Sequence, residues 1–411
     1  MSDDSIIRVV SLNCWGLKYI SKHRQERLTA VSDQLVQNAT NYDIIALQEI
    51  WVEGDFLKIK DSISHELPYS KFFYSGILSG PGLCVFSRFP IASASLRPFI
   101  LNGRPSAFFR GDWYVGKSVA SVVIDHPLQK IEVLSAHMHA PYGPGDAAYT
   151  CHRTCQAWEM ANMARRSTAS GHLAIVVGDL NSTEESLTYR LFNQFAGLDE
   201  CWAAKYGVYK GDIAELTLQE QVNIAGCTCD SLLNTWRADR QKHEAKRLDY
   251  IFFDRRRAVA EESRVTFTEA IPGIGSYSDH FAVEADLKIL GEQQPTPGND
   301  AGRDLELELY NEMLALINEY KHTSISQKSF RNLHFWLSVV FLIGLLIAVF
   351  WGAASGRAYV GFIFMLLAIV VTATGLLDGL IAFLFGRFEM RALREFESEI
   401  KIAQARALSG K

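Results

Sequence analysis

The stretch LAIVVGDLNS (residues 173–182) places two polar residues directly after an apolar run. Residues 174–177 (AIVV) are apolar and mostly β-branched, which is typical of a strand that is buried on both faces. Asp179 and Asn181 follow at the point where such a strand must end. A single Asp or Asn after a strand is usually a turn former. The stretch therefore gains functional meaning only if other strands end in the same way.

Several other predicted strands also carry polar residues at or beside their ends. We predict strands at 6–13, 43–50, 82–88, 118–125, 130–138, 173–180, 247–253 and 281–290. The polar residues at these positions are Asn13, Glu49, His137, Asp179, Asn181, Asp249, Asp279 and His280. Each group alone is a weak signal, but several of them along one chain indicate a catalytic site.

The spacing of the strands predicts the fold class. Several strands lie only one turn apart, which favours antiparallel sheets with helices outside them over a β-α-β array. Helices are predicted at 22–38, 53–65, 147–169 and 184–195. We therefore expect residues 1–290 to form one α+β catalytic domain.

Two apolar segments near the C-terminus are long enough to cross a membrane. Residues 335–354 and 358–377 are each 20 residues without a charged side chain, and a membrane-spanning helix needs about 20. Only three residues separate them, which predicts a tight hairpin. The alternative, two buried core helices, predicts a polar stripe that neither segment has. Basic residues flank both outer ends, so the positive-inside rule places the catalytic domain in the cytosol.

The remaining segments complete the predicted organisation. We expect a linker at 291–303, a juxtamembrane helix at 304–330, a transmembrane hairpin at 333–386 (spans about 335–354 and 358–385) and a cytosolic amphipathic helix at 387–411. Asp378 is costly in lipid, so we expect its carboxylate to reach the headgroup region, with a polar contact to a partner helix as the alternative. Two glycine pairs, Gly352 with Gly356 and Gly375 with Gly379, either pack the hairpin or a homodimer or mark flexible helix ends.

Composition excludes some functions. A formal net charge of −5 is unsuited to a nucleic-acid backbone, which is bound by clustered Lys and Arg. The seven cysteines have no framework spacing, and no signal-peptide core lies at residues 2–11. We therefore expect free thiols in a reducing cytosol.

The stretch GDWYVGKS (111–118) matches the phosphate-binding pattern G-x-x-x-x-G-K-[ST]. Its flanks argue against a nucleotide site, because a loop-like segment with Pro105 precedes it and a β-branched segment follows it. A phosphate loop needs a strand before it and a helix after it. We therefore predict no ATP binding. Asp112 and Lys117 could instead form an ion pair, and an ion pair that exchanges partners can act as a switch.

Together these motifs resemble the neutral sphingomyelinases of the endonuclease/exonuclease/phosphatase superfamily, and most nearly the fungal inositol phosphosphingolipid phospholipases C. The runs that carry the resemblance include NCWGLKYISKHR (13–24), NGRPSAFFRGDWYVGKS (102–118), SAHMHAPY (135–142), VVGDLNS (176–182) and CDSLLNTWRA (229–238). The resemblance implies a four-layer sandwich of two mainly antiparallel sheets flanked by helices, followed by a transmembrane hairpin. It also implies phosphodiester hydrolysis that releases ceramide and a phosphorylated headgroup.

Phosphodiester hydrolysis requires a hard cation and a base for water. Glu49 is a suitable Mg²⁺ ligand, with Asn13 as a neutral oxygen donor close by. His280 is the best candidate for the base. The resemblance assigns Asp249 to orient His280 and places Asp279 nearer the metal, but the sequence leaves open which of these two carboxylates pairs with the histidine.

Further residues receive roles from the same chemistry. His137 and Asn181 would hold the phosphate and its developing charge, and Asp179 would align the water or help to protonate the leaving oxygen. The resemblance makes Asp112 and Lys117 a regulatory pair. Candidates for headgroup contact are Arg104, Arg110 and Tyr142.

The resemblance also predicts partners. Anionic phospholipids are expected as activators, with contacts at Lys321, Lys328, Arg331, Arg387 and Arg391. The expected location is the endoplasmic reticulum or the outer mitochondrial membrane. The sequence does not decide between phosphoinositol and phosphocholine headgroups, and the alternative functions are a membrane-anchored phosphoinositide phosphatase or a nuclease of the same fold.

Overall fold

The computed structural model describes residues 5–77, 79–291 and 300–409, which belong to two compact units. The first unit comprises Met1–Asn102 and Tyr114–Leu309, and the second comprises Gly103–Trp113 and Tyr310–Lys411. Part of the predicted linker, residues 292–299, lies outside the described residues.

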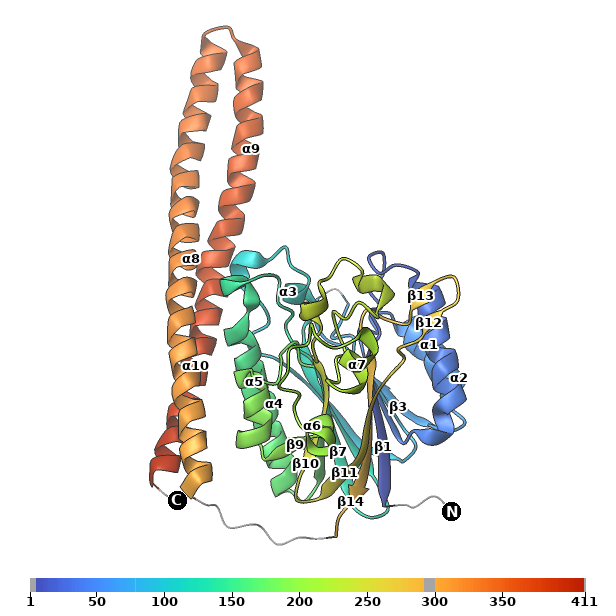
Figure 1. The fold of residues 1–411 in the computed structure, drawn as a ribbon. Coiled ribbons are helices and arrows are strands. Elements are labelled where there is room, and N and C mark those ends of the chain that lie inside the picture. The colour runs from blue at the N-terminus through green and yellow to red at the C-terminus, as the bar shows by residue number, and fades with distance from the viewer. Residues whose placement is uncertain (1–4, 78, 292–299, 410–411) are drawn as a thin grey trace. The chain divides into compact units, whose positions relative to one another are not determined.

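Two six-stranded sheets form the centre of the first unit (Figure 1). In order across the first sheet, the strands are β11 (Ala258–Thr266), β14 (Ala282–Ile289), β1 (Ile6–Asn13), β2 (Ile44–Gln48), β4 (Cys84–Ser87) and β3 (Tyr69–Phe72). Across the second sheet they are β5 (Ile91–Pro98), β6 (Ser118–Asp125), β7 (Lys130–His137), β8 (Leu173–Asp179), β10 (Asp249–Asp254) and β9 (Leu198–Glu200). The central pairs β1–β2 and β7–β8 are parallel, and the other pairings within these sheets are antiparallel.

The alternating side chains of the strands build the core. On β1, Ile7 and Val9 pack between the two sheets, whereas Val10 and Leu12 face the helices α1 (Arg24–Asn38) and α2 (Glu53–Ile63). On the other side of the unit, α4 (Thr150–Ala169) packs against β7 and β8 (Figure 1). The layers are therefore helix, sheet, sheet, helix, and the predicted four-layer sandwich is confirmed.

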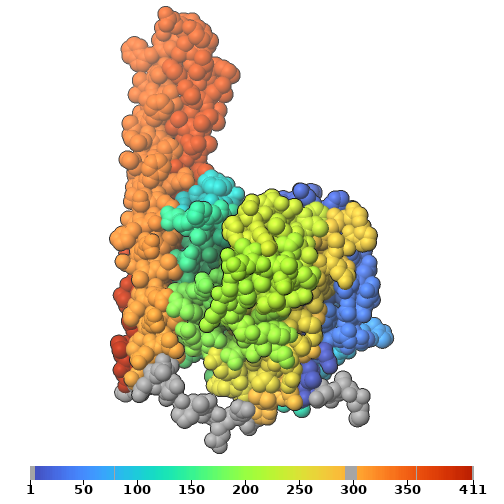
Figure 2. All heavy atoms as spheres, in the orientation of Figure 1, coloured from blue at the N-terminus to red at the C-terminus, as the bar shows by residue number. Residues whose placement is uncertain are grey.

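Shorter elements connect these layers. They are η1 (Ala39–Asn41), α3 (Asp112–Val115), η3 (Gly145–Ala148), α5 (Leu187–Arg190), the π-helical turn η4 (Leu191–Phe195), α6 (Cys201–Tyr206), α7 (Leu218–Asn223), η5 (Thr235–Arg237), η6 (Lys242–Glu244) and the small hairpin of β12 (Ala270–Ile271) and β13 (Gly275–Ser276). The segment between β9 and β10 covers much of the face of the first unit in Figure 2.

The parallel pairs bring the predicted strand-end residues to one edge, which we call the site edge. Asn13 is in register with Gln48, and His137 is in register with Asp179. Asp249 faces Asp179 across the β8–β10 pair, because β10 begins where β8 ends.

The helices of the second unit include both predicted spans. They are α8 (Asp300–Ala354), which begins in the first unit, α9 (Ala358–Leu380), the π-helical turn η7 (Ile381–Phe385) and α10 (Gly386–Ser409). Among the described residues, two helices are long and apolar enough to cross a membrane, by length and composition. The predicted juxtamembrane helix and first span are parts of the single helix α8.

Contacts between α8 and α9 bear on two of the expectations for the hairpin. Asp378 forms ion pairs with Arg331 and, at 2.7 Å between Oδ2 and Nδ1, with His334. These contacts agree with the alternative of a polar contact between helices, and the depth of Asp378 relative to the headgroup region stays a prediction. A Cβ atom at Gly375 would lie 2.5 Å from Ser338 Cβ, and one at Gly379 would lie 2.6 Å from a ring carbon of Phe335. This glycine pair therefore lets the two helices pack closely.

Candidate active site

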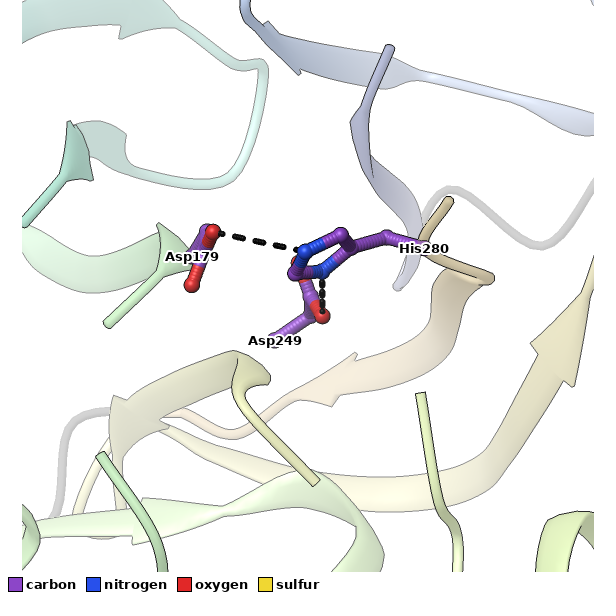
Figure 3. Close-up of side chains that lie close together, drawn as sticks. All are labelled: Asp179, Asp249 and His280. Atoms are coloured by element: carbon purple, nitrogen blue, oxygen red, sulfur yellow. Dashed lines mark hydrogen bonds and ion pairs between the residues drawn. The ribbon is translucent and has the colours of Figure 1, made fainter. Parts of the chain in front are cut away.

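A hydrogen-bonded Asp–His pair lies at the site edge (Figure 3). His280 Nδ1 lies 2.8 Å from Asp249 Oδ2, and the Thr228 hydroxyl donates to the same oxygen at 2.6 Å. All three side chains are buried. This arrangement answers the question that the sequence left open: Asp249, rather than Asp279, pairs with the histidine.

The other ring nitrogen of His280 faces Asp179 and Cys229. Nε2 lies 3.9 Å from Asp179 Oδ2 and 3.5 Å from the sulfur of Cys229. Burial lowers the pKa of His280, but the nearby groups Cys229, Asp249 and Asp179 outweigh burial and hold it well above the usual value. These groups therefore stabilise the protonated form of the ring.

Asp279 has a different partner. Arg237 Nη2 donates to Asp279 Oδ2 at 2.8 Å. The preceding residue, Ser278, donates its hydroxyl to the Asn13 carbonyl oxygen at 2.6 Å. The Ser278 bond ties the segment before β14 to the end of β1, and the Arg237 bond gives Asp279 a partner different from that of the adjacent His280.

A second group of polar side chains surrounds Asn13. Asn13 Nδ2 donates to Glu49 Oε1 at 3.1 Å and to Asp179 Oδ2 at 3.0 Å. His137 lies between the same carboxylates, with Nε2 at 3.5 Å from Asp179 and Nδ1 at 4.0 Å from Glu49. The structure thus brings four of the predicted site residues together.

The backbone holds Glu49 in an uncommon conformation. Its φ of 59° lies in the left-handed region, which non-glycine residues rarely adopt. The Glu49 carbonyl accepts a hydrogen bond from Gly16 N at 3.1 Å. A Cβ atom at Gly16 would lie 2.2 Å from that oxygen, so only glycine permits this contact.

The carboxylates of the site fit a cation. Burial, and then the charge of Asp279, raises the pKa of Glu49 to about 7. Burial also raises the pKa of Asp179 to about 6, although His280 acts in the opposite direction. Burial is the main cause of both shifts, and buried carboxylate oxygens gathered in this way would suit Mg²⁺.

Two details bear on which residues could hold the metal. Asn13 presents its NH₂ group to the two carboxylates, while its oxygen accepts from Trp15 N at 3.0 Å. As placed, it bridges carboxylates and would offer an oxygen ligand only after a rotation of its amide. A second grouping of potential ligands, Asp179, Asp249 and His280, has its ligand atoms within 4.8 Å of one another. However, the Asp249–His280 hydrogen bond already occupies Nδ1.

Lys117 reaches this region from the start of β6. Its ammonium group is buried and donates to the Met138 carbonyl at 2.6 Å, and Asn181 Nδ2 donates to the same oxygen at 3.1 Å. Burial is the largest influence on the pKa values of Glu49 and Asp179, and the charge of Lys117 acts against it. Asp112 belongs to the second unit, so its pairing with Lys117 stays a prediction.

The segment GDWYVGKS lacks the local structure of a phosphate loop. Asp112–Val115 form a single helical turn, and Ser118 begins the strand β6 where a phosphate loop would start a helix.

The headgroup candidates fall in both units. The Arg104 guanidinium lies 5.8 Å from the ring centroid of Tyr320, and that of Arg110 lies 5.9 Å from the ring centroid of Phe109. Tyr142 is in the first unit, where its ring lies beside that of His139 at a centroid distance of 5.9 Å. Their joint role stays a prediction.

The five lipid candidates differ in their surroundings. Lys321 pairs with Glu397, and Arg331 pairs with Asp378. The Arg387 guanidinium lies 5.9 Å from the Phe383 ring centroid.

Sequence reasoning missed a cluster of charges next to the site. Asp230, which follows the histidine contact Cys229, forms ion pairs with Lys246 at 2.8 Å, Arg240 at 3.2 Å and Arg237 at 3.5 Å. The run CDSLLNTWRA contained part of this cluster, but no spacing rule connects Asp230 to Lys246. Sequence reasoning also missed Thr228, because the role of its hydroxyl group becomes clear only when the hydrogen bond to Asp249 is known.

Comparisons with known proteins agree with this geometry. The family model described as "Endonuclease/Exonuclease/phosphatase family" matches residues 10–280. The inositol phosphosphingolipids phospholipase C of Saccharomyces cerevisiae is 42% identical over 98% of this chain and 92% of its own length. The protein of the same description from Schizosaccharomyces pombe is 37% identical over 96% and 93%, respectively. A crystal structure of beta toxin from Staphylococcus aureus shares the fold, with a TM-score of 0.53 and 17% identity over 68% of this chain and 99% of that one.

Proposed function

Because the chain belongs to the endonuclease/exonuclease/phosphatase family, we propose that it is a phospholipase C-type hydrolase of membrane sphingolipids. It would cleave the phosphodiester into ceramide and a phosphorylated headgroup. The observation that carries the proposal is the buried Asp249–His280 pair, in which Nε2 of His280 faces Asp179. The names of the fungal relatives support the substrate class.

In the proposed reaction, His280 Nε2 accepts a proton from the attacking water. Asp249 fixes the ring through Nδ1 and stabilises the imidazolium that forms. Water attacks phosphorus in one step, and the ceramide oxygen leaves. Asp179, with its raised pKa, aligns the water or supplies a proton to the leaving oxygen.

The remaining residues bind the phosphate and its charge. His137 and Asn181 would donate to the phosphoryl oxygens, and the buried Lys117 adds positive charge nearby. Glu49, together with Asp279 or a reoriented Asn13, would hold Mg²⁺, which when bound would neutralise charge on the phosphoryl group.

The membrane setting belongs to the same proposal. Residues 1–290 would act from the cytosolic side, tethered by the hairpin at 333–386, in the endoplasmic reticulum or the outer mitochondrial membrane. Anionic phospholipids would activate the enzyme, and the Asp112–Lys117 pair would act as the switch. The tethered catalytic domain would then diffuse along the membrane surface, where the phosphodiester of a sphingolipid lies at the headgroup boundary.

The test uses the full chain in detergent micelles with three labelled substrates. These are an inositol phosphosphingolipid, sphingomyelin and a phosphoinositide. Release of ceramide from either sphingolipid supports the proposal and identifies the headgroup. Release of inorganic phosphate from the phosphoinositide without ceramide release would favour the phosphatase alternative. His280→Ala serves as the control for contaminating activity.

A further inference from the structure

Apolar side chains are unusually exposed on two loops of the first unit. Among its described residues, the most exposed large apolar side chains are those of Tyr19 (91%), Ile77 (82%), Ile20 (71%) and Tyr74 (61%). Tyr19 and Ile20 follow β1, on the dark blue loop in Figure 1, and Tyr74 and Ile77 follow β3. Because β3 runs in the same direction as β2, both loops leave the first sheet at the site edge.

The loop after β1 has a fixed base. The buried Arg27 guanidinium donates to the carbonyl oxygens of Cys14, Trp15 and Lys22, which lie on both sides of the loop tip. Arg24 Nε donates to the Gly16 carbonyl at 2.7 Å. These bonds tie the loop ends to the domain, so that the tip is held outward.

The tip adopts an unfavourable conformation. Tyr19 has a φ of 74°, in the left-handed region that aromatic residues rarely adopt. The turn is closed by Ser21 N, which donates to the Leu17 carbonyl at 3.0 Å. An aromatic residue in this conformation that is almost fully exposed adds little to the packing of the fold, so its exposure points to a role outside the folded domain.

The charged side chains within the loop itself are basic, and one of them, Arg24, is paired with Asp55 of α2. Residues 16–25 (GLKYISKHRQ) contain Lys18, Lys22, His23 and Arg24 and no acidic residue, in a chain of net charge −5. Lys18 and Lys22 are exposed, and the Lys18 ammonium lies 5.1 Å from the Tyr19 ring centroid. An apolar tip with lysines beside it matches the surface of an anionic bilayer, where the tip enters the headgroup boundary and the ammonium groups meet lipid phosphates.

We propose that the segment Lys18–Lys22, together with Ile77, is a docking wedge that seats the site edge on an anionic bilayer. This inference rests on the proposed function, because seating the edge in this way brings the active site to the depth of the lipid phosphodiester. The bilayer is favoured over a second copy of the chain because a symmetric contact would place like-charged loops together.

The first experiment measures how deeply the loop after β1 enters the bilayer. Ile20→Cys, labelled with an environment-sensitive dye, is compared with labelled Leu128→Cys on the turn between β6 and β7, at the opposite edge. The native cysteines are all buried, so the label goes to the new thiol. In vesicles of phosphatidylcholine and phosphatidylserine that contain nitroxide-labelled lipid, the full chain should show quenching at residue 20 and little at residue 128. Equal quenching, or none at residue 20, would overturn the proposal.

The second experiment separates docking from chemistry. The variant Tyr19→Ser/Ile20→Ser should hydrolyse sphingolipid in anionic vesicles roughly tenfold more slowly than wild type, because two apolar anchors are lost. It should keep its rate on a monomeric short-chain sphingolipid, and Leu128→Ser should keep both rates. The docking wedge is rejected if the double variant hydrolyses sphingolipid in vesicles at the wild-type rate. It is also rejected if the double variant changes its oligomeric state but still binds vesicles. If the wild-type protein is inactive on both substrates, the proposed function is rejected instead. The quenching experiment at residue 20 then still tests whether the loop docks on the bilayer.

Discussion

His280 Nδ1 and Asp249 Oδ2 lie 2.8 Å apart, in a pair that joins residues 31 positions apart in the chain. The Thr228 hydroxyl fixes the carboxylate from a third segment. Because Asp249 engages Nδ1, the neutral ring has its free electron pair on Nε2, facing Asp179. The tautomer that the proposed reaction needs is therefore set by Asp249, which engages the ring nitrogen that does not face Asp179.

The first prediction concerns this pair. Asp249→Asn should preserve the fold but lower the hydrolysis rate on the order of a thousandfold, because the amide neither stabilises the imidazolium nor enforces the required tautomer. Initial rates on a labelled sphingolipid check the effect. Asp199→Asn, at the exposed ion pair with Arg255, is the matched control and should behave as wild type. A loss of less than tenfold for Asp249→Asn would contradict the proposed role of the pair.

The inner part of the fold could be predicted from the sequence, whereas the edges could not. The eight predicted strands correspond to the inner strands of the two sheets: β1, β2, β4, β6, β7, β8, β10 and β14. The strands β3, β5, β9 and β11 were missed, and each is the edge of a sheet. Edge strands are less buried and carry a weaker apolar pattern, as the largely exposed β5 shows.

The site could be predicted in part for a related reason. Strand ends carry their own signal, since a polar residue after an apolar run is visible in the sequence. Such a signal does not reveal which side chains form hydrogen bonds with one another, because Asp249 and Asp279 are the same residue type. Only the fold places Asp249 beside His280 and Asp279 beside Arg237. The Asp230 cluster carried no strand-end signal, because its partners lie in the connection between β9 and β10, outside the strands of the two six-stranded sheets.

A second prediction concerns Lys117. Lys117→Met keeps the length of the side chain but removes the charge and the hydrogen bond to Met138, so the hydrolysis rate should fall on the order of a hundredfold. Lys130→Met, at the start of β7, is the exposed control and should retain activity. Equilibrium dialysis with labelled ATP should show no binding to wild type. Tight ATP binding, or full activity of Lys117→Met, would contradict this view of the segment.

The third prediction concerns pH and Asp230. Burial raises the pKa of Asp230, but Lys246, Arg237 and Arg240 outweigh it and hold the pKa below the ordinary value of 3.8. A lowered folded-state pKa contributes stability above the unfolded value, and this contribution is lost as the pH falls through the folded value. Asp230→Asn should therefore unfold a few degrees earlier than wild type at pH 7, with a difference that shrinks below pH 4.

Asn suits this position because Asp230 has a φ of 55°, which Asn tolerates. The measurement is thermal unfolding in detergent between pH 3 and pH 8. A difference that stays constant across this range would show that the effect is not electrostatic.

A fourth prediction concerns the hairpin. Gly379→Ala should destabilise the packing of α8 against α9, because the new Cβ would lie 2.6 Å from a ring carbon of Phe335. Gly361→Ala in the same helix has its nearest neighbour at 4.0 Å and should be neutral or slightly stabilising, since Ala favours helix. Thermal unfolding of both variants in lipid nanodiscs makes the comparison. Equal stability would show that the glycine does not set the packing distance.

The last prediction separates activity from stability at Glu49. A chelator should abolish hydrolysis and added Mg²⁺ should restore it, whereas Glu49→Gln should require more Mg²⁺ and react on the order of a hundredfold more slowly. In metal-free protein the same substitution should raise the unfolding temperature, because Glu49 is buried and repelled by Asp279. Glu66→Gln, at a surface pair with Arg88, is the control for both measurements. A buried carboxylate that serves to bind a cation should lower the reaction rate when it is replaced, yet raise the stability of the metal-free protein. Full activity in the presence of the chelator would exclude this role for Glu49.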